Sequence, residues 1–228
     1  MERAEELFPI AQPGDGSACN SMATTLRVAA EQLTPNASMR SGQRDHFIYV
    51  SCFCEVDDLL SQWRAYGASG GFAIGFDSEA LAAATLENQD VRLEQVLYGE
   101  HAMVEMVKRV VPAIAPHPKS HPGTQGYFQA RRVAFPALAT VKNSAFAEER
   151  EWRLLVAGTD NQDGLEFRIG NLGLIPYVEL AFDVSAVREV IVGPGGHQEL
   201  REESVRRILR VSGFDSVNVR VSSAPYRG

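Results

Sequence analysis

The alternation of apolar and polar positions divides the chain into short segments of strand and helix character. Residues 46–54, HFIYVSCFC, are almost continuously apolar and rich in β-formers, which predicts a strand buried on both faces. Residues 57–66 carry apolar side chains at helical spacing. We therefore expect a helix there that Asp57 caps and Gly67 ends.

The rest of the pattern predicts strands and helices that mix without strict alternation. We expect strands or extended segments at 71–77, 91–99, 149–155, 171–182, 188–196 and 217–223, and helices at 20–33, 78–85, 100–115, 124–139 and 197–213. This order predicts an α+β fold, a mixed sheet with flanking helices. We expect a single domain at 46–228, preceded by an N-terminal arm and helix at 1–45.

Composition and charge narrow the class of protein. The chain of 228 residues is 45% hydrophobic and 22% charged, which is typical of a globular protein. Its net charge of -7 leaves no basic stripe for coating nucleic acid. No apolar run approaches a membrane span, and the acidic start lacks the order of a signal peptide. We expect a cytoplasmic protein with no membrane partner.

The three cysteines do not form a disulfide framework. Cys52 and Cys54 lie two positions apart and share one face of the predicted strand. Without a further cysteine or histidine cluster nearby, we interpret them as small buried hydrophobic side chains and expect no metal.

The stretch AFAEEREWRLLVAG, residues 145–158, holds the strongest candidate chemistry. If 149–155 is a strand, Glu149, Glu151 and Arg153 project from one face. Two carboxylates within roughly 7 Å repel one another, which raises one pKa unless an arginine offsets the charge. The spacing is compatible with an exposed face held by an ion pair and with a carboxylate pair that performs catalysis.

The glycine-rich segment GPGG, residues 193–196, lies between a predicted strand and a predicted helix. Glutamates crowd the first turns of that helix, where they complement its dipole and would repel a phosphate. We interpret the segment as a turn.

Several blocks taken together resemble a known bacterial family, the Domain of Unknown Function 2971. The blocks that carry the resemblance are Cys52-Phe53-Cys54, Trp63 to Tyr66, Gly71 to Phe76, Lys142, Phe146, Glu149 to Arg153, and Val190 to Pro194. Cys54 stands where the family usually has serine, and the aromatic, basic opening strand of the family has no counterpart here. ADP-ribosyltransferases, whose folds this family resembles, usually have an arginine or histidine on that strand to fix the cofactor, and Arg44 and His46 are only weak candidates for it here.

The order of elements in that family is similar to that of ADP-ribosyltransferase-like folds. The resemblance implies an NAD-dependent ADP-ribosyltransferase or an NAD glycohydrolase, a class that includes toxins and phage-defence effectors. It implies that Glu151 faces the oxocarbenium-like charge of the transition state and that Glu149 serves the acceptor. By the same resemblance, the NAD-binding residues would be Ser51, Trp63, Tyr66, Lys142 and Arg153.

Two other interpretations remain open. A non-enzymatic ligand- or protein-binding module would use Glu149, Glu151 and Arg153 as a structural ion network, with Glu151 paired to Arg153 and no pocket. A carboxylate-based, metal-dependent hydrolase or nuclease would need a third oxygen ligand within coordination distance. An NAD-using enzyme would show Glu151 lining a cleft beside the predicted aromatic side chains, with a nucleotide as ligand and a macromolecular acceptor that the sequence does not specify.

Overall fold

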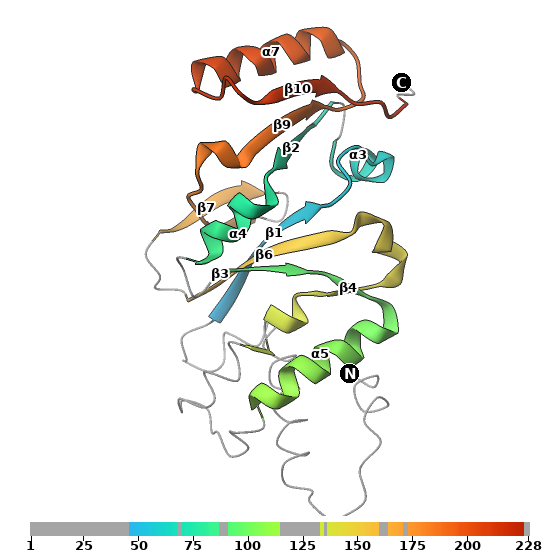
Figure 1. Ribbon diagram of the computed structural model, residues 1–228, viewed down its shortest axis with the longest axis vertical. Helices are drawn as coiled ribbons and strands as arrows, with labels where there is room; N and C mark the ends of the chain where they lie inside the picture. Colours follow the sequence, from blue (N-terminus) through green and yellow to red (C-terminus); the bar gives the residue numbers. More distant parts are fainter. Residues whose placement is uncertain are drawn as a thin grey trace, which may run out of the picture. The chain divides into compact units, whose positions relative to one another are not determined.

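The computed structural model describes residues 46–67, 70–86, 91–114, 133–134, 136–159, 164–170 and 173–225 (Figure 1). The predicted N-terminal arm, the helix expected at 20–33, Cys19 and Arg44 lie outside the described residues. So does most of the helical region expected at 124–139.

The described chain forms two compact units. The first unit takes in the described residues of 46–48, 97–144 and 157–159, and the second takes in those of 49–96, 145–156 and 164–225. The domain boundary expected at residue 45 stays a prediction.

The first unit is built around one long helix. Helix α5 (Gly99–Ile114) follows strand β4 (Leu97–Tyr98), which pairs in parallel with strand β5 (Val141–Lys142). Met106 and Val110 of this helix are buried with Ala134. Because β4 belongs to this unit, the single strand expected at 91–99 is wrong: it is two strands, separated at Val96.

The second unit contains two three-stranded sheets and a two-stranded hairpin. One sheet has the order β1 (His46–Cys54), β6 (Glu151–Thr159), β3 (Val91–Gln95). The other has the order β10 (Asn218–Val221), β9 (Val187–Val192), β2 (Phe72–Phe76), with β10 parallel and β2 antiparallel to β9 (Figure 1). Strands β7 (Leu165–Gly170) and β8 (Gly173–Val178) form the hairpin.

Helices cover these sheets. The elements are α3 (Leu60–Tyr66), α4 (Ser78–Leu86), α7 (Gln198–Val211) and the 3₁₀ turns η2 (Ser144–Glu149) and η3 (Val184–Ala186). Helix α7 lies along β10, and its Val205 packs on valines of β9, of β10 and of the segment just before β10 (Figure 1). Mixed sheets with flanking helices confirm the predicted α+β class.

The structure corrects the predicted cap of helix α3 and the predicted start of strand β6. Helix α3 begins at Leu60 with no side-chain cap, because the carboxylate of Asp57 pairs instead with Arg220. Strand β6 begins at Glu151 and not at Glu149, because Arg150 adopts a left-handed backbone conformation with φ 42° that ends η2.

The prediction of buried cysteines is also wrong. Cys52 is exposed and Cys54 is half-buried. The near-continuous apolar run at 46–54 therefore marks a strand whose second half is partly open to solvent. Strand β7, which has an apolar side chain at every second position, was not predicted at all.

The ring of Trp63 is packed against glycines, and this contact joins three elements. A Cβ atom on Gly193, just after β9, would lie 2.6 Å from Cζ3 of Trp63 and 2.8 Å from the carbonyl oxygen of Gly71. A Cβ on Gly67 would lie 2.7 Å from the carbonyl oxygen of Trp63. The amide of Gly193 also donates to Gly71, at 2.9 Å. The turn predicted at 193–196 is confirmed, and the absence of a side chain at Gly193 lets the indole approach the backbone.

We expect Gly193→Ala to lower the free energy of unfolding by about 2 kcal/mol, because the new methyl group displaces a buried indole. Urea denaturation followed by circular dichroism measures the loss. The matched control is Gly196→Ala, where nothing lies within 4 Å of the new Cβ. A Gly193→Ala protein as stable as this control would contradict the account of the packing.

Candidate functional site

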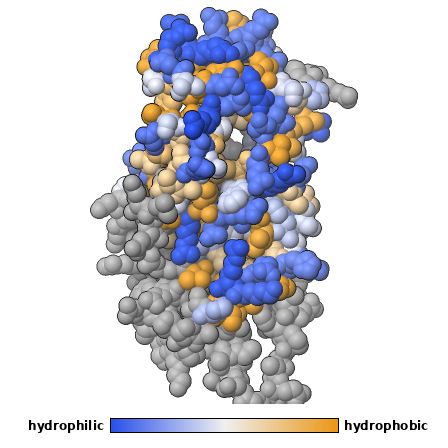
Figure 2. Space-filling model, viewed as in Figure 1, coloured by the Kyte–Doolittle hydropathy of each residue, from blue (hydrophilic) through white to orange (hydrophobic). Residues whose placement is uncertain are grey.

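The second unit contains a pocket of about 810 Å³. The pocket is lined by β1 and the segment after it, by α3, β2 and α4, and by single residues of β3, β6 and β9. The space-filling view has a small opening between side chains at the level of β2 and α3 (Figure 2). The pocket therefore lies where the two three-stranded sheets approach one another.

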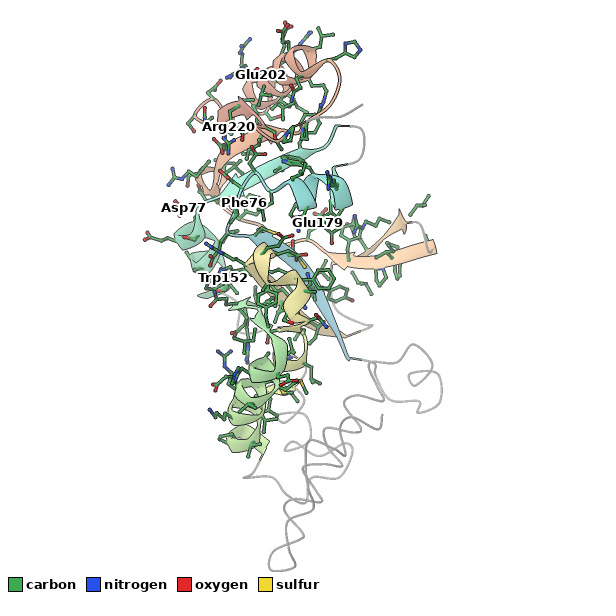
Figure 3. All side chains as sticks on the ribbon, turned by 90° about the vertical axis from the view of Figure 1, so that its right-hand side faces the viewer. Phe76, Asp77, Trp152, Glu179, Glu202 and Arg220 are labelled. Atoms are coloured by element: carbon green, nitrogen blue, oxygen red, sulfur yellow. The ribbon has the colours of Figure 1, made fainter. Side chains whose placement is uncertain are left out.

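Aromatic side chains dominate the lining. Six of the lining residues are aromatic: Phe53, Trp63, Tyr66, Phe72, Phe76 and Trp152. Figure 3 labels Phe76 on β2 and Trp152 on β6, which belong to different sheets. The rings of Phe53 and Phe76 meet edge to face with centroids 5.7 Å apart. The wall provides aromatic side chains for contact with a ligand, although Arg201 already lies over the ring of Phe72, 5.2 Å from its centroid.

The charged groups of the lining are all acidic. Glu55 and Asp57 line the pocket, and among the described lining residues there is no lysine, arginine or histidine. Oε1 of Glu55 accepts a hydrogen bond of 2.8 Å from the indole of Trp152. Asp57 is paired with Arg220 at 2.6 Å, so in the described part of the chain Glu55 is the lining carboxylate whose charge no ion pair offsets, and it favours a positive or neutral ligand over an anion.

Asp58 fixes the inner wall of the pocket. Its Oδ1 accepts from the indole nitrogen of Trp63 at 2.7 Å and from the hydroxyl of Ser222, and its Oδ2 accepts from the amide of Ser223 at 2.7 Å. Burial raises the pKa of this carboxyl, but the hydrogen bonds from Ser222, Trp63 and Ser223 outweigh it and hold the pKa at about 2. One ionised carboxylate therefore ties α3 to the segment after β10.

Glu151 and Arg153 form an ion pair with two hydrogen bonds. Nε of Arg153 donates to Oε1 of Glu151 at 2.8 Å, and Nη2 donates to Oε2 at 3.1 Å. Glu151 is only 2% exposed. Its hydrogen bond raises the pKa of the Arg153 guanidinium above its usual value, with a smaller contribution from Cys52.

This ion pair lies on the opposite face of β6 from the pocket. Trp152 lines the pocket, whereas its neighbours Glu151 and Arg153 are not among the lining residues. Alternate side chains of a strand point to opposite faces, so a residue on either side of Trp152 faces away from the pocket.

The structure brings some of the predicted site residues together at one pocket, and the others are not among the residues that line it. Ser51, Trp63 and Tyr66 line the same pocket, and Tyr66 is 77% exposed. Glu149 is buried at the end of η2, and Lys142 lies on β5 of the first unit. The side chain of His46 lies outside the described residues.

The ion pair agrees with the binding-module interpretation, but that interpretation expected no pocket. The enzyme interpretation expected Glu151 in a cleft, and the pocket beside Ser51, Trp63 and Tyr66 does not include Glu151 in its lining. Among the described residues, no three histidine, cysteine, aspartate or glutamate side chains are grouped so as to hold a metal ion.

Sequence reasoning missed several residues of the site. Glu55, Phe76 and Trp152 line the pocket but were not singled out as candidates, and neither was Asp58, which supports it. The sequence does contain one signal for Trp152: it directly follows the glutamates of 148–151, and Phe146 precedes them. The two serine partners of Asp58 are 164 and 165 positions away along the chain, so no local pattern could have identified them.

Fold and site together define an α+β protein with an aromatic, acidic pocket between two sheets. Residues 62–154 match the model of a family described as "Protein of unknown function (DUF2971)". The match confirms the resemblance over a stretch shorter than half of the 228-residue chain and includes α3, β2, β3 and the start of β6.

Comparisons with curated proteins and with solved structures found no match. None of these comparisons supports the similarity to ADP-ribosyltransferase-like folds. In the part of the chain that the structure describes, no helix has both the length and the apolar character needed to cross a membrane.

The depressed pKa of Asp58 predicts a specific loss of stability in acid. A carboxyl whose folded pKa is lowered from 3.8 to about 2 contributes stability above pH 4 that disappears as the pH falls towards 2. We expect Asp58→Asn to be less stable than the wild type by about 2 kcal/mol at neutral pH, because four donors lose a charged acceptor.

That difference should shrink between pH 4 and pH 2 as Asp58 of the wild type is protonated. Urea unfolding at a series of pH values measures it. Asp215→Asn, at an exposed aspartate in the turn after α7, is the control for general effects of removing a charge. A difference that stays constant down to pH 2 would show that Asp58 is not the carboxyl with the lowered pKa.

Proposed function

We propose that the second unit is a ligand-binding module for a compact, flat organic cation. The observation that supports this most directly is the lining of the pocket, which combines six aromatic residues with two carboxylates and no basic residue among those described. Aromatic faces attract cations through the quadrupole of the ring, and this attraction strengthens when water is excluded.

The position of the charges suits this class of ligand. Glu55 and Asp57 follow directly after β1, so both carboxylates lie at the same end of the lining strand. Each is also held by a partner, Glu55 by the indole of Trp152 and Asp57 by Arg220 at 2.6 Å. A cation stacked on Trp152 would lie beside a carboxylate that is already oriented, which lowers the entropic cost of binding.

Binding can be followed through the protein's own fluorescence. The chain has two tryptophans, and both line the pocket. The probes are three rings of similar shape and different charge: 1-methylnicotinamide is a cation, nicotinamide is neutral and nicotinate is an anion. We expect saturable fluorescence changes with a dissociation constant of about 1 mM or below for the cation and about tenfold weaker binding of the anion.

A carboxylate variant tests the charge preference. Glu55→Gln should weaken binding of 1-methylnicotinamide severalfold and leave nicotinamide unchanged. Glu148→Gln removes the same charge at an exposed residue outside the pocket lining and should leave all three probes unchanged. Equal affinity for the cation and the anion, or no saturable change with any probe, would rule out the proposal.

A second candidate function is the NAD-dependent ADP-ribosyltransferase or NAD glycohydrolase activity that the family resemblance implies. It is favoured by the meeting of Ser51, Trp63 and Tyr66 at one pocket, because the resemblance assigns all three to NAD. The oxidised nicotinamide ring is itself a flat cation. For this chemistry Glu55 is the carboxylate that already lines the pocket, whereas Glu151, which the resemblance implies, is not among the lining residues.

Release of nicotinamide from NAD, with and without cell lysate as a source of acceptor, tests this candidate. We expect release by the wild type and a loss of at least about 100-fold in Glu151→Gln or Glu55→Gln, whichever removes the carboxylate that stabilises the transition state. Circular dichroism of Glu151→Gln establishes that it is folded, since it loses a buried ion pair. If NAD is not consumed while 1-methylnicotinamide binds, the enzyme candidate is wrong and the binding module stands.

A further inference from the structure

The hairpin of β7 and β8 presents one face made entirely of apolar side chains. Residues that pair directly across two antiparallel strands share a face. Leu165 pairs with Val178, Phe167 with Pro176, and Ile169 with Leu174, so these six residues form what we call the hairpin face. The opposite face carries Glu166 and Tyr177, which are joined by a hydrogen bond.

The hairpin face is open to solvent in the single chain. Phe167 is 60% exposed, Ile169 is 91% exposed and Leu174 is 72% exposed. In the side view the hairpin projects outward from the other strands of its unit (Figure 3). An isolated two-stranded hairpin is only marginally stable in water, because it needs an apolar partner for one face.

Pro176 determines how the hairpin can associate. Proline has no amide hydrogen, so the pair of Phe167 and Pro176 cannot exchange two hydrogen bonds and must be of the non-hydrogen-bonded type. In such pairs the backbone groups point away from the partner strand, so Pro176 removes a donor from the outer edge of β8. Addition of another strand to that edge is thereby disfavoured, and the apolar face remains the favoured contact.

We propose that the hairpin face is a dimer interface, on which a second copy of this chain stacks its own hairpin face across a two-fold axis. The face carries no charged side chain that would select a different partner. A wholly apolar face is self-complementary, as a two-fold interface requires. This inference is independent of the pocket and of its ligand.

The exposed apolar area of the hairpin face limits how much surface a dimer can bury. The three most exposed side chains contribute about 400 Å² of apolar surface, given roughly 150–200 Å² for a large apolar side chain. With the rest of the face, two copies bury about 800–1,000 Å², at the low end for specific interfaces. Because this area is below that of standard stable interfaces, we expect a weak dimer, with a dissociation constant of about 10–100 µM.

Net charge adds a second expectation. Each chain carries a net charge of -7, so two copies repel one another at low ionic strength. Added salt screens this repulsion and also favours apolar burial. The dimer should therefore become tighter as salt is raised from about 0.05 to about 0.5 M, whereas an interface held by ion pairs would weaken.

Sedimentation velocity of the full chain, from about 5 to about 500 µM, is the test, because this range spans the expected dissociation constant. We expect the wild type to dimerise over this range and Ile169→Glu to remain monomeric. The side chain of Ile169 is almost fully exposed in the single chain, so the substitution should leave the fold intact, as circular dichroism can establish. Ile208→Glu is the matched control, at another exposed isoleucine on α7, and should dimerise like the wild type.

A wild type that stays monomeric throughout the range would overturn the proposal. So would a dimer that Ile169→Glu leaves intact, or one that Ile208→Glu abolishes. A monomer whose stability falls sharply in Ile169→Glu but not in Ile208→Glu would show that the same chain covers the face, and would also overturn it.

Discussion

The burial of Trp63 is the constraint on which the rest of the second unit depends. Its indole nitrogen is held by Asp58, and its ring lies against backbone that has room for it because residues 67 and 193 are glycines. Arg201 on α7 reinforces the arrangement by donating to the carbonyl oxygens of Gly71 and Gly193. Trp63 and Arg201 together connect α3 with α7 and with the glycines beside β2 and β9. Trp63 also lines the pocket.

The elements with a strong local pattern could be predicted from the sequence. The apolar run of β1, the amphipathic helix α5 and the succession of β9, α7 and β10 were all identified, because each has a periodicity that its own residues determine. The fold class followed from their order. The pairing of strands did not, since an α+β chain offers many ways to join the same strands into sheets.

The wrong predictions for Asp57 and Glu149 have physical causes that the local sequence pattern does not contain. Asp57 has the side chain of a helix cap, yet an arginine from β10 binds its carboxylate and the helix starts three residues later. Glu149 was placed on a strand because alternation suggested it, but the left-handed conformation of Arg150 ends the preceding turn there. Such competition between local preference and tertiary contact cannot be read from spacing.

The candidate site illustrates the same limit. The alternation of Glu151, Trp152 and Arg153 was read correctly as two faces of one strand, but the sequence did not reveal which face meets the pocket. The structure assigns the pocket to the tryptophan and the ion pair to the opposite side. Glu151 is buried and paired with the half-buried Arg153, whereas Trp152 between them faces the space that a ligand can enter.

The contact of Asp58 with Ser222 and Ser223 has a consequence for how the chain acquires its structure during synthesis. These residues are separated by more than 160 positions, and the parallel strand β10 that precedes the serines needs β9 as its neighbour. The ribosome must synthesise and release the chain up to residue 223 before Ser222 and Ser223 can donate their hydrogen bonds to Asp58. Until then the apolar side chains of the early strands and α3 lack part of the neighbours that bury them, which is the condition under which incompletely folded chains aggregate.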